Sequence, residues 1–284
     1  MKCKGIRLFF LLIAVGNIAT AQPSENSFNT AKPWTYWWWM SSAVDSGNIS
    51  HQLALFSKSG LGGVHIIPIY GVKGYEDRFI PFMSRQWLNI VSYTVKEARR
   101  LGLGVDLSLG SGWPYGGPFV SSGDVARRFE WKGDSFHIKP TGQQVKRATR
   151  GGEGPVLDYF DAEALQHYLK HFEALDSISL RASYHDSYEV YKANWTKHFL
   201  QKFRQLRGYD LWPYLAKLKS NAKDDSALRI LYDYRETMSD LLTDSFTAVL
   251  AGWSRQHKLL LRDQAHGSPA NIIDLYAMAD IPET

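Results

Sequence analysis

The stretch GVDLSLGSGWPYGGP at residues 104–118 decides the fold class of this chain. It begins with a short, largely apolar segment at 104–110 and continues directly into a loop rich in glycine and aromatic residues. Two similar apolar segments precede it, TYWWWM at 35–40 and GVHIIPIY at 63–70. Apolar runs of this length are typical of parallel strands that are buried on both faces of a sheet.

A helix is predicted between each pair of these strands. Asn48 or Ser50 can cap the first helix, and Ser84 can cap the second, which carries an apolar stripe from Trp87 to Leu101. Strands and helices that alternate in this order form right-handed crossover units. The predicted fold is therefore α/β, a (β/α)8 TIM-type barrel. Its functional residues are expected at the mouth, which consists of the carboxyl ends of the strands and the loops that follow them.

Three further strands are predicted toward the carboxyl terminus, at 177–184, 259–262 and 276–281. The remaining helices are predicted at 162–172, 195–206 and 225–257. A closed barrel of this type needs eight strands. We therefore expect the domain at 33–284 to be an incomplete barrel with about six strands, and we interpret the sequence as a fragment of a larger domain.

Residues 127–154 interrupt the alternation of strands and helices. The segments FEWK at 129–132 and SFHIK at 135–139 surround the dipeptide Gly133-Asp134, a pattern typical of a β-hairpin. We interpret the region as an insertion after the third strand that borders the mouth.

Residues 1–21 show the three parts of a secretory signal peptide: a basic start, an apolar stretch, and small residues before a cleavage site after Ala21. Residues 22–32 are polar and are predicted to form a linker. The apolar stretch is too short for a membrane span, which takes about 20 apolar residues, and no later segment reaches that length. Cys3, the single cysteine, lies before the apolar stretch, so a lipid anchor is not expected. The mature protein is expected to be secreted or periplasmic, without a membrane span.

The charge balance argues against nucleic acid as a partner. Lys and Arg number 33, Asp and Glu number 28, and three of the basic residues lie in the predicted signal peptide. The charges spread along the chain, whereas nucleic-acid binding needs basic residues clustered on one face. Aromatic residues make up 14% of the chain. That share suits a packed core, and it also suits a carbohydrate cleft, where flat rings cover the apolar faces of sugars.

Eight short motifs occur in a characteristic order along the chain. They are YWWW at 36–39, GGVH at 62–65, EARRLGL at 97–103, GWPYGGP at 112–118, DSYE at 186–189, RGYD at 207–210, QAHG at 264–267 and ADIPE at 279–283. In this order the motifs resemble the catalytic region of the α-L-rhamnosidases of glycoside hydrolase family 106. The resemblance covers nearly the whole mature chain.

The resemblance implies a secreted enzyme that removes terminal rhamnose from polysaccharides or oligosaccharides. It also implies an inverting mechanism and a calcium ion near the substrate, whose ligands we do not assign. Members of the family are much longer than 284 residues, so the chain resembles the N-terminal part of the catalytic region. A truncated barrel that binds carbohydrate without a complete acid and base pair is the alternative interpretation.

Inverting hydrolysis of a glycoside needs two carboxyl groups, roughly 6.5 to 9.5 Å apart, one as general acid and one to activate water. Glu189 and Glu283 each follow a predicted strand, so both are expected at the same mouth. We predict that Glu189 is the general acid, and that Asp186 keeps its pKa high as a like-charged neighbour. Glu283 is the candidate for the second carboxylate, although the base can instead lie beyond Thr284.

His65, His185 and His266 all lie at predicted strand ends. Three histidines at one mouth are compatible with a zinc site and a metal-dependent hydrolase. The close His-x-His or His-x-x-x-His pair that usually supplies such a site is absent from the sequence. We therefore favour hydrogen bonding to sugar hydroxyls for these histidines, and for Gln264 in the QAHG motif.

Trp38 and Trp113 are candidate platforms for a sugar ring. Side chains alternate along a strand, so Trp38 cannot share a face with Trp37 and Trp39, and packing is the favoured role for two of these three. Trp113 lies between glycines in a loop, where a large ring is expected to contact a ligand if it is exposed.

Overall fold

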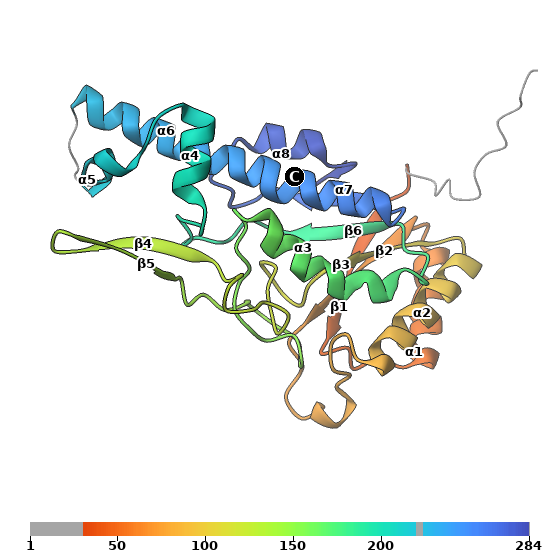
Figure 1. Ribbon diagram of the computed structural model, residues 1–284. Coiled ribbons are helices and arrows are strands. Elements are labelled where there is room, and N and C mark those ends of the chain that lie inside the picture. The colour runs from red at the N-terminus through yellow and green to blue at the C-terminus, as the bar shows by residue number, and fades with distance from the viewer. Residues whose placement is uncertain (1–30, 220–223, 284) are drawn as a thin grey trace, which may run out of the picture.

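The computed structural model describes residues 31–219 and 224–283. The predicted signal peptide and most of the predicted linker lie outside these residues. The centre of the fold is a sheet of six strands in the order β1-β2-β3-β6-β7-β8 (Figure 1). These strands are β1 (Trp34–Met40), β2 (Gly63–Ile69), β3 (Gly104–Ser108), β6 (Ala182–Asp186), β7 (Leu260–Gln264) and β8 (Ile281–Pro282).

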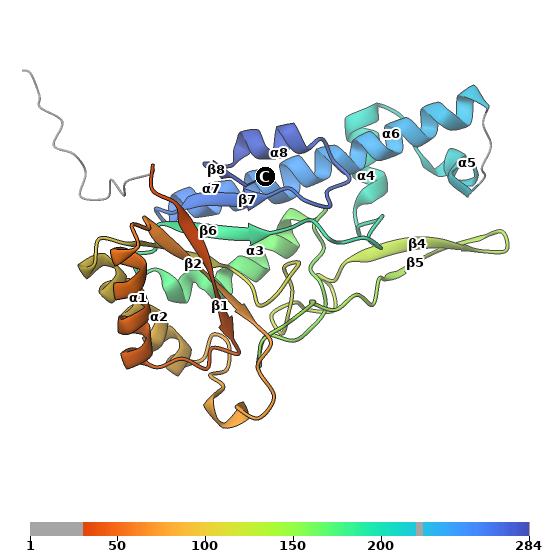
Figure 2. The same ribbon diagram turned by 180° about the vertical axis from the view of Figure 1, so that it is seen from behind.

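Each strand of this sheet runs parallel to its neighbours. The predicted α/β fold with six parallel strands is therefore confirmed, and the sheet corresponds to an incomplete TIM-like barrel. Its helices lie on the outer face, with α3 and α7 in front of the sheet in Figure 1. Figure 2 shows the opposite, inner face, with β1 and β2 nearest the viewer.

The helices are α1 (Ser46–Lys58), α2 (Arg85–Arg100), α3 (Ala162–Lys170), α4 (Phe199–Arg207), α5 (Leu215–Lys219), α6 (Asp225–Leu241), α7 (Ala248–Gln256) and α8 (Ile272–Met278). The predicted helices correspond to α1, α2, α3, α4 and the pair α6 and α7, whereas α5 and α8 were not predicted. A π-helical turn at Leu242–Thr247 joins α6 to α7, so the long helix predicted at 225–257 changes its hydrogen-bond pattern midway. Within the described residues, no helix is both long enough and apolar enough to cross a membrane.

The helix caps agree with the sequence at α2 and differ at α1. Ser84 caps α2 as predicted, since its hydroxyl accepts a hydrogen bond from the Trp87 backbone N–H. The cap of α1 is Asp45, whose carboxylate accepts the Asn48 N–H at 2.9 Å. The prediction of Asn48 or Ser50 was wrong because the helix begins earlier, at Ser46.

Two predicted strands differ from the observed ones near the mouth. The segment 177–184 forms a strand only from Ala182 onward, because the backbone at Ile178 and Leu180 makes turn hydrogen bonds instead. Residues 276–278 of the strand predicted at 276–281 form the end of helix α8, which Asn271 caps, and strand β8 begins only at Ile281. Strands β6 and β7 also run two residues beyond their predicted ends, which places Asp186 and Gln264 inside strands rather than after them.

The predicted hairpin forms β4 (Arg127–Lys132) and β5 (Ser135–Pro140), and it projects from the body of the molecule (Figure 1). The chain then returns along the loop that follows β3, where Trp113 forms an antiparallel bridge with Lys146. The approach is close, because a Cβ on Gly112 would lie 2.0 Å from the Lys146 carbonyl oxygen. The segment after the hairpin therefore lies against the mouth of the sheet.

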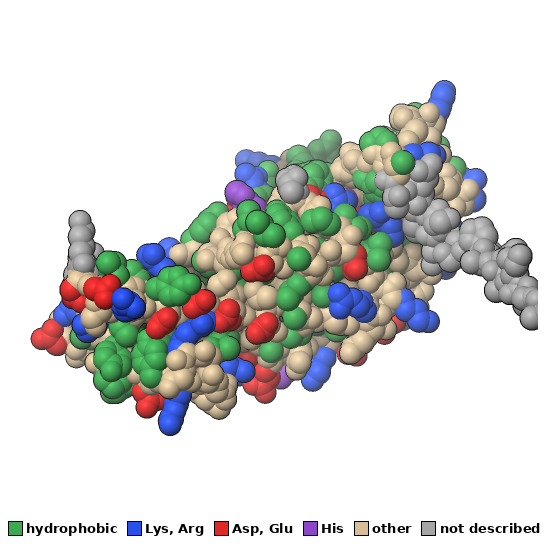
Figure 3. Space-filling model, turned by 90° about the horizontal axis from the view of Figure 1, so that it is seen from above, with side chains coloured by type: hydrophobic (Ala, Val, Ile, Leu, Met, Phe, Trp, Pro, Cys, Tyr) green, Lys and Arg blue, Asp and Glu red, His purple; other side chains and the backbone are tan. Residues whose placement is uncertain are grey.

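The outer surface near α6 to α8 mixes basic, acidic and hydrophobic side chains (Figure 3). The apolar core lies beneath this layer, between the sheet and its helices. Its largest fully buried side chains include Trp39, Trp87 and Trp195.

Candidate active site

The inner face of the sheet carries polar side chains at several neighbouring positions. Tyr36 lies beside His65, and His65 lies beside Asp106, in the register of the first three strands. On the later strands Tyr184 lies beside Arg262. A barrel interior is usually filled with bulky apolar residues, so this polar face is a candidate site.

Asp106 is fully buried and lies between two arginines. Arg181 donates from Nε to its Oδ1 at 2.7 Å, and Arg262 donates from Nη1 to its Oδ2 at 3.2 Å. Arg262 also donates from Nε to Glu283 Oε2 at 2.5 Å. One arginine therefore joins two carboxylates, which is the pairing that buried charges require.

Glu283, the predicted second carboxylate, lies on this inner face. The Tyr184 hydroxyl donates to its Oε1 at 3.3 Å, and the Tyr36 hydroxyl bonds to the same oxygen. Burial raises the pKa of Glu283 to about 7, whereas the contact with Arg262 favours the ionised form. Glu283 can therefore gain or lose a proton near neutral pH.

His65 is buried between two tyrosine rings of the inner face. The ring centroids of Tyr184 and Tyr36 lie 3.8 and 5.2 Å from that of His65. Burial lowers the pKa of His65 well below its ordinary value, and the two arginines add to the decrease. Within the described residues neither ring nitrogen has a hydrogen-bond partner, which is unusual for a buried polar group.

Glu189, the predicted general acid, lies in the loop that follows β6. Its Oε2 is 2.6 Å from Lys146 Nζ, and its Oε1 is 4.0 Å from His266 Nε2. The side chain is 16% exposed. Gly267 in the loop after β7 packs closely on it, since a Cβ there would lie 3.3 Å from Glu189 Cγ. The mouth therefore brings together the DSYE and QAHG motifs, as their positions predicted.

Asp186 is the last residue of β6, and its register partner on β7 is Gln264. Burial raises the pKa of Asp186 to about 6. The negative charge of Glu189 adds to the rise, while His185 and His266 oppose it. Asp186 is thus a second carboxyl group at the mouth, and its pKa lies well above the ordinary value for an aspartate.

Trp38 and Trp113, predicted separately, lie together. Their rings meet edge to face, with centroids 6.3 Å apart at an interplanar angle of 85°. Trp38 remains 46% exposed. Trp37 and Trp39 instead pack edge to face on each other, and Trp37 also packs on Phe56 of α1. The alternation along β1 therefore leaves one tryptophan of the three on the inner face, beside Trp113.

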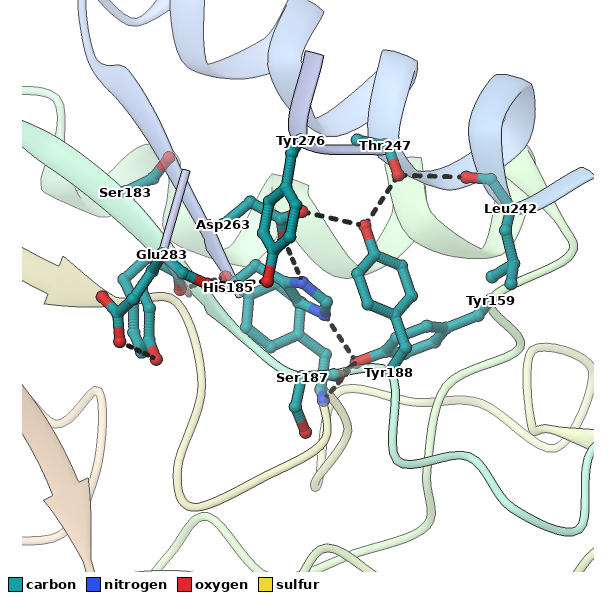
Figure 4. Close-up of polar contacts among 12 residues, drawn as sticks. Tyr159, Ser183, His185, Ser187, Tyr188, Leu242, Thr247, Asp263, Tyr276 and Glu283 are labelled. Carbon is teal, nitrogen blue, oxygen red and sulfur yellow. Dashed lines mark hydrogen bonds and ion pairs between the residues drawn. The ribbon is translucent and has the colours of Figure 1, made fainter. Parts of the chain in front are cut away.

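His185 lies on the helix side of β6, within a closed hydrogen-bond network (Figure 4). Its Nδ1 is 2.7 Å from Asp263 Oδ1, and its Nε2 is 3.1 Å from the Tyr159 hydroxyl. Tyr188 donates to Asp263 Oδ2 at 3.3 Å and bonds to Thr247 Oγ1 at 2.7 Å. The His185 side chain is fully buried, so the structure places it away from the surface that a sugar would contact.

The three histidines are not brought together. His65 lies on the inner face, His185 lies on the helix side, and His266 lies in the mouth loop with its side chain 69% exposed. In the part of the chain that the structure describes, no group of three or more His, Cys, Asp or Glu side chains is arranged to hold a metal ion. A zinc site built on these histidines therefore does not form.

Calcium, implied by the resemblance, needs six to eight oxygen ligands. The two inner carboxylates, Asp106 and Glu283, are both occupied by arginine. Glu189 is paired with Lys146. The described residues do not fit a calcium site, and we assign no chemical step to that ion.

A cavity of about 710 Å³ lies between α1 and the loops that follow β1 and β2. Asp45, Asn48 and Arg78 are among its lining residues. None of the candidate site residues lines it, so it is not part of this site.

Sequence reasoning missed five charged residues of the site. Asp106, Arg181 and Arg262 left a signal, because each is a charged residue within a predicted strand. Lys146 and Arg147 left none, because their position at the mouth depends on the path of the chain after the hairpin.

Comparisons with known proteins agree with the resemblance found in the sequence. A family model described as alpha-L-rhamnosidase, glycoside hydrolase family 106, matches residues 25–137 and 130–283. A curated protein of Formosa agariphila, named "Putative beta-glucuronidase", is 21% identical over 370 aligned positions, covering 90% of this chain and 32% of that protein.

Two solved structures are similar in fold. The rhamnosidase from Novosphingobium sp. PP1Y has a TM-score of 0.72 at 15% identity, covering 91% of this chain and 49% of that one. The beta-galactosidase from Marinomonas ef1 has a TM-score of 0.55 at 10% identity, covering 88% and 40%. The chain thus spans about a third of the curated relative and about half of the solved rhamnosidase.

A parallel barrel sheet with carboxyl groups and tryptophans at its mouth is an arrangement that barrel glycoside hydrolases use. Because the family model matches most of its length, the chain belongs to the α-L-rhamnosidase family, glycoside hydrolase family 106.

Proposed function

We propose that this chain acts in a secreted glycoside hydrolase that removes terminal rhamnose from polysaccharides or oligosaccharides by an inverting mechanism. One observation carries the proposal. In a chain of the rhamnosidase family, three carboxyl groups lie at the mouth and on the inner face of the sheet, those of Asp186, Glu189 and Glu283. The export of the protein is proposed from the signal peptide pattern alone.

In the proposed mechanism, Glu189 is the general acid. Its carboxyl protonates the glycosidic oxygen while the bond from that oxygen to the rhamnose anomeric carbon breaks. The second carboxyl accepts a proton from a water molecule that attacks the opposite face of the sugar. Glu283 is the candidate for this base, because its contact with Arg262 favours the ionised form that can accept a proton. The rings of Trp38 and Trp113 are nearly perpendicular, so one of them would stack on the apolar face of a sugar while the other contacts its edge.

Proton NMR of the reaction with p-nitrophenyl α-L-rhamnoside tests the proposal. Inversion predicts that β-L-rhamnose appears first and that the α anomer forms afterwards by mutarotation. First release of the α anomer would contradict the inverting mechanism, and a complete lack of rhamnose release would contradict the rhamnosidase activity of this chain.

Cleavage of a β-glucuronide is a second candidate function, favoured by the name of the curated relative. The same measurement with p-nitrophenyl β-D-glucuronide separates the two candidates. We expect turnover of the rhamnoside only, and preferential cleavage of the glucuronide would favour the second.

The third possibility is a carbohydrate-binding barrel without catalysis, supported by the exposed Trp38 beside the partly buried Trp113. Calorimetric titration with rhamnose-terminated oligosaccharide distinguishes it. Binding without turnover favours the binding protein, whereas binding together with turnover favours the hydrolase.

A further inference from the structure

Ser187 turns the chain between the end of β6 and Glu189. Its backbone has a φ of 71°, a left-handed conformation that is unfavourable for a residue other than glycine and persists only where neighbouring groups hold it. Within the described residues the Ser187 hydroxyl has no hydrogen-bond partner. The Tyr159 hydroxyl reaches the Ser187 carbonyl oxygen only at 3.5 Å, which is too long for a strong hydrogen bond. The turn must therefore be held mainly through its neighbours.

The turn at Ser187 changes the side of the sheet to which the next side chain points. His185 faces the helices, and side chains alternate along a strand, so an unbroken β6 would direct Tyr188 to the inner face. Tyr188 instead faces the helices, where its hydroxyl and His185 share the carboxylate of Asp263 (Figure 4). The residue after it, Glu189, then lies at the mouth.

Tyr188 anchors the chain directly before Glu189. The residue is buried, and its backbone N–H donates to the His266 carbonyl oxygen at 2.9 Å. Its own carbonyl oxygen accepts the Val190 N–H at 2.7 Å, which makes Glu189 the middle residue of a three-residue turn. A shift of the Tyr188 side chain would therefore shift the backbone that carries the Glu189 carboxyl group.

The hydroxyl of Thr247 holds the far end of the Tyr188 side chain. The two hydroxyl oxygens are 2.7 Å apart, a shorter contact than the 3.3 Å between Tyr188 and Asp263. Thr247 is fully buried and is the last residue of the π-helical turn between α6 and α7. Its hydroxyl also donates to the Leu242 carbonyl oxygen, five residues earlier, at 3.1 Å. Single π-helical turns within α-helices occur frequently at functional sites.

We propose that Thr247 is a positioning residue for the general acid: its hydroxyl fixes Tyr188, and Tyr188 fixes the turn that directs Glu189 into the mouth. The inference rests on the proposed role of Glu189. Proton transfer requires the donor and acceptor atoms to lie within about 2.6 to 3.2 Å of each other. A displaced acid therefore slows the chemical step more than it weakens substrate binding, which lowers kcat and leaves KM nearly unchanged.

The test removes this hydroxyl in Thr247→Val. With phenyl α-L-rhamnoside as substrate, kcat is expected to fall about tenfold or more, because small displacements of a catalytic group are costly. Thr247→Ser keeps the hydroxyl and should retain most of the wild-type kcat. Thr94→Val is the matched control, since Thr94 is also fully buried and its hydroxyl donates to the Ile90 carbonyl oxygen within α2. Its kcat should stay close to that of the wild type.

The leaving group shows whether a loss of kcat arises at the acid. p-Nitrophenol is a stronger acid than phenol, so its departure needs less help from a proton donor. The loss of kcat in Thr247→Val should therefore be several-fold smaller with p-nitrophenyl α-L-rhamnoside than with the phenyl glycoside. A variant that merely contains less folded protein loses the same factor on both substrates. Equal losses on the two substrates, or no loss on either, would overturn the proposal.

A crystal structure of Thr247→Val tests the positioning even if the chain turns over neither rhamnoside. We expect a changed φ at Ser187 and the loss of the contact between Glu189 and Lys146 Nζ, which is 2.6 Å in the wild type. That result would support the role of Thr247 although the proposed hydrolysis had failed. An unchanged turn with the contact intact would contradict it. If Thr247→Val does not fold, Tyr188→Phe removes the same hydrogen bond from the other side and replaces it in both measurements.

Discussion

Strands β6 and β7 carry ionisable side chains on both of their faces, and the two faces hold them differently. On the helix side, both ring nitrogens of His185 and both carboxylate oxygens of Asp263 have hydrogen-bond partners. On the inner side and at the mouth, burial raises the pKa of Asp186, at the end of β6, to about 6 and that of Glu283, which follows the neighbouring strand β8, to about 7. The hydrogen-bonded network on the helix side holds the two strands together. The carboxyl groups whose pKa is raised by burial are the candidates for proton exchange.

The largest effect on stability is expected from Asp263→Ala. The substitution leaves His185 and Tyr188 without their buried partner, and breaking a buried pair costs about 3 to 5 kcal/mol. Urea unfolding followed by circular dichroism measures the loss. Asp210→Ala is the control, because Asp210 pairs with Arg204 at the exposed surface and should leave stability close to that of the wild type. If Asp263→Ala lowers the free energy of unfolding by less than about 1 kcal/mol, the network on the helix side does not hold the strands together as the comparison requires.

Asp186→Asn should produce a smaller effect of opposite sign. The folded pKa of about 6 lies above the ordinary value of 3.8, so the folded protein holds this proton to higher pH than the unfolded chain does. The resulting stabilisation is present below pH 3.8 and is lost as pH rises through 6. Asn mimics the protonated form, so the variant should be more stable than the wild type at pH 8, by about 1 to 3 kcal/mol, and similar to it at pH 3.5.

Urea unfolding of both proteins between pH 3.5 and pH 8 gives this difference in free energy directly. Because Glu283 and the other groups titrate in both proteins, their contributions largely cancel in the difference. A difference that does not change with pH, or that favours the wild type at pH 8, would show that Asp186 is not under electrostatic stress.

Trp113→Ala should have the smallest of these effects. Loss of one stacking platform is expected to raise KM for a rhamnoside by roughly five- to tenfold, about 1 kcal/mol of binding, with less change in kcat. Steady-state kinetics measures both constants. Trp212→Ala is the control for loss of a tryptophan elsewhere, since Trp212 is 63% exposed and lies in the short helical turn before α5. An equal change in both variants would contradict a platform role for Trp113.

The sequence predicted the sheet and the mouth because both depend on local patterns. Apolar runs predict the strands. Residues that follow a strand, such as Glu189 and His266, lie at the mouth even where the end of the strand is predicted two residues too early. His185 shows the limit of this reasoning. The predicted strand ended at Tyr184, whereas β6 runs to Asp186, and side chains within a strand alternate between faces. The side chain of His185 therefore faces the helices, and its partner Asp263 lies 78 positions away.

The pairing of Glu189 with Lys146 was not predictable for a different reason. Lys146 lies in the segment that returns from the β4–β5 hairpin, and no periodicity in 141–154 indicates where that segment packs. Its position depends on long-range backbone contacts, such as the bridge between Trp113 and Lys146. Residues placed by such contacts, Arg147 among them, become visible only in the structure.

The most direct test of the contrast measures both turnover and stability in Glu189→Gln. Both Glu189→Gln and the wild type are assayed on p-nitrophenyl α-L-rhamnoside. The control is Glu173→Gln, which changes an exposed glutamate in the 3-10 turn after α3. We predict that kcat of Glu189→Gln falls by roughly 10² to 10⁴-fold, while its Tm stays near that of the wild type. Turnover at the wild-type rate, or a loss of turnover that is accompanied by an equal loss of folding, would contradict the role of Glu189 as the proton donor.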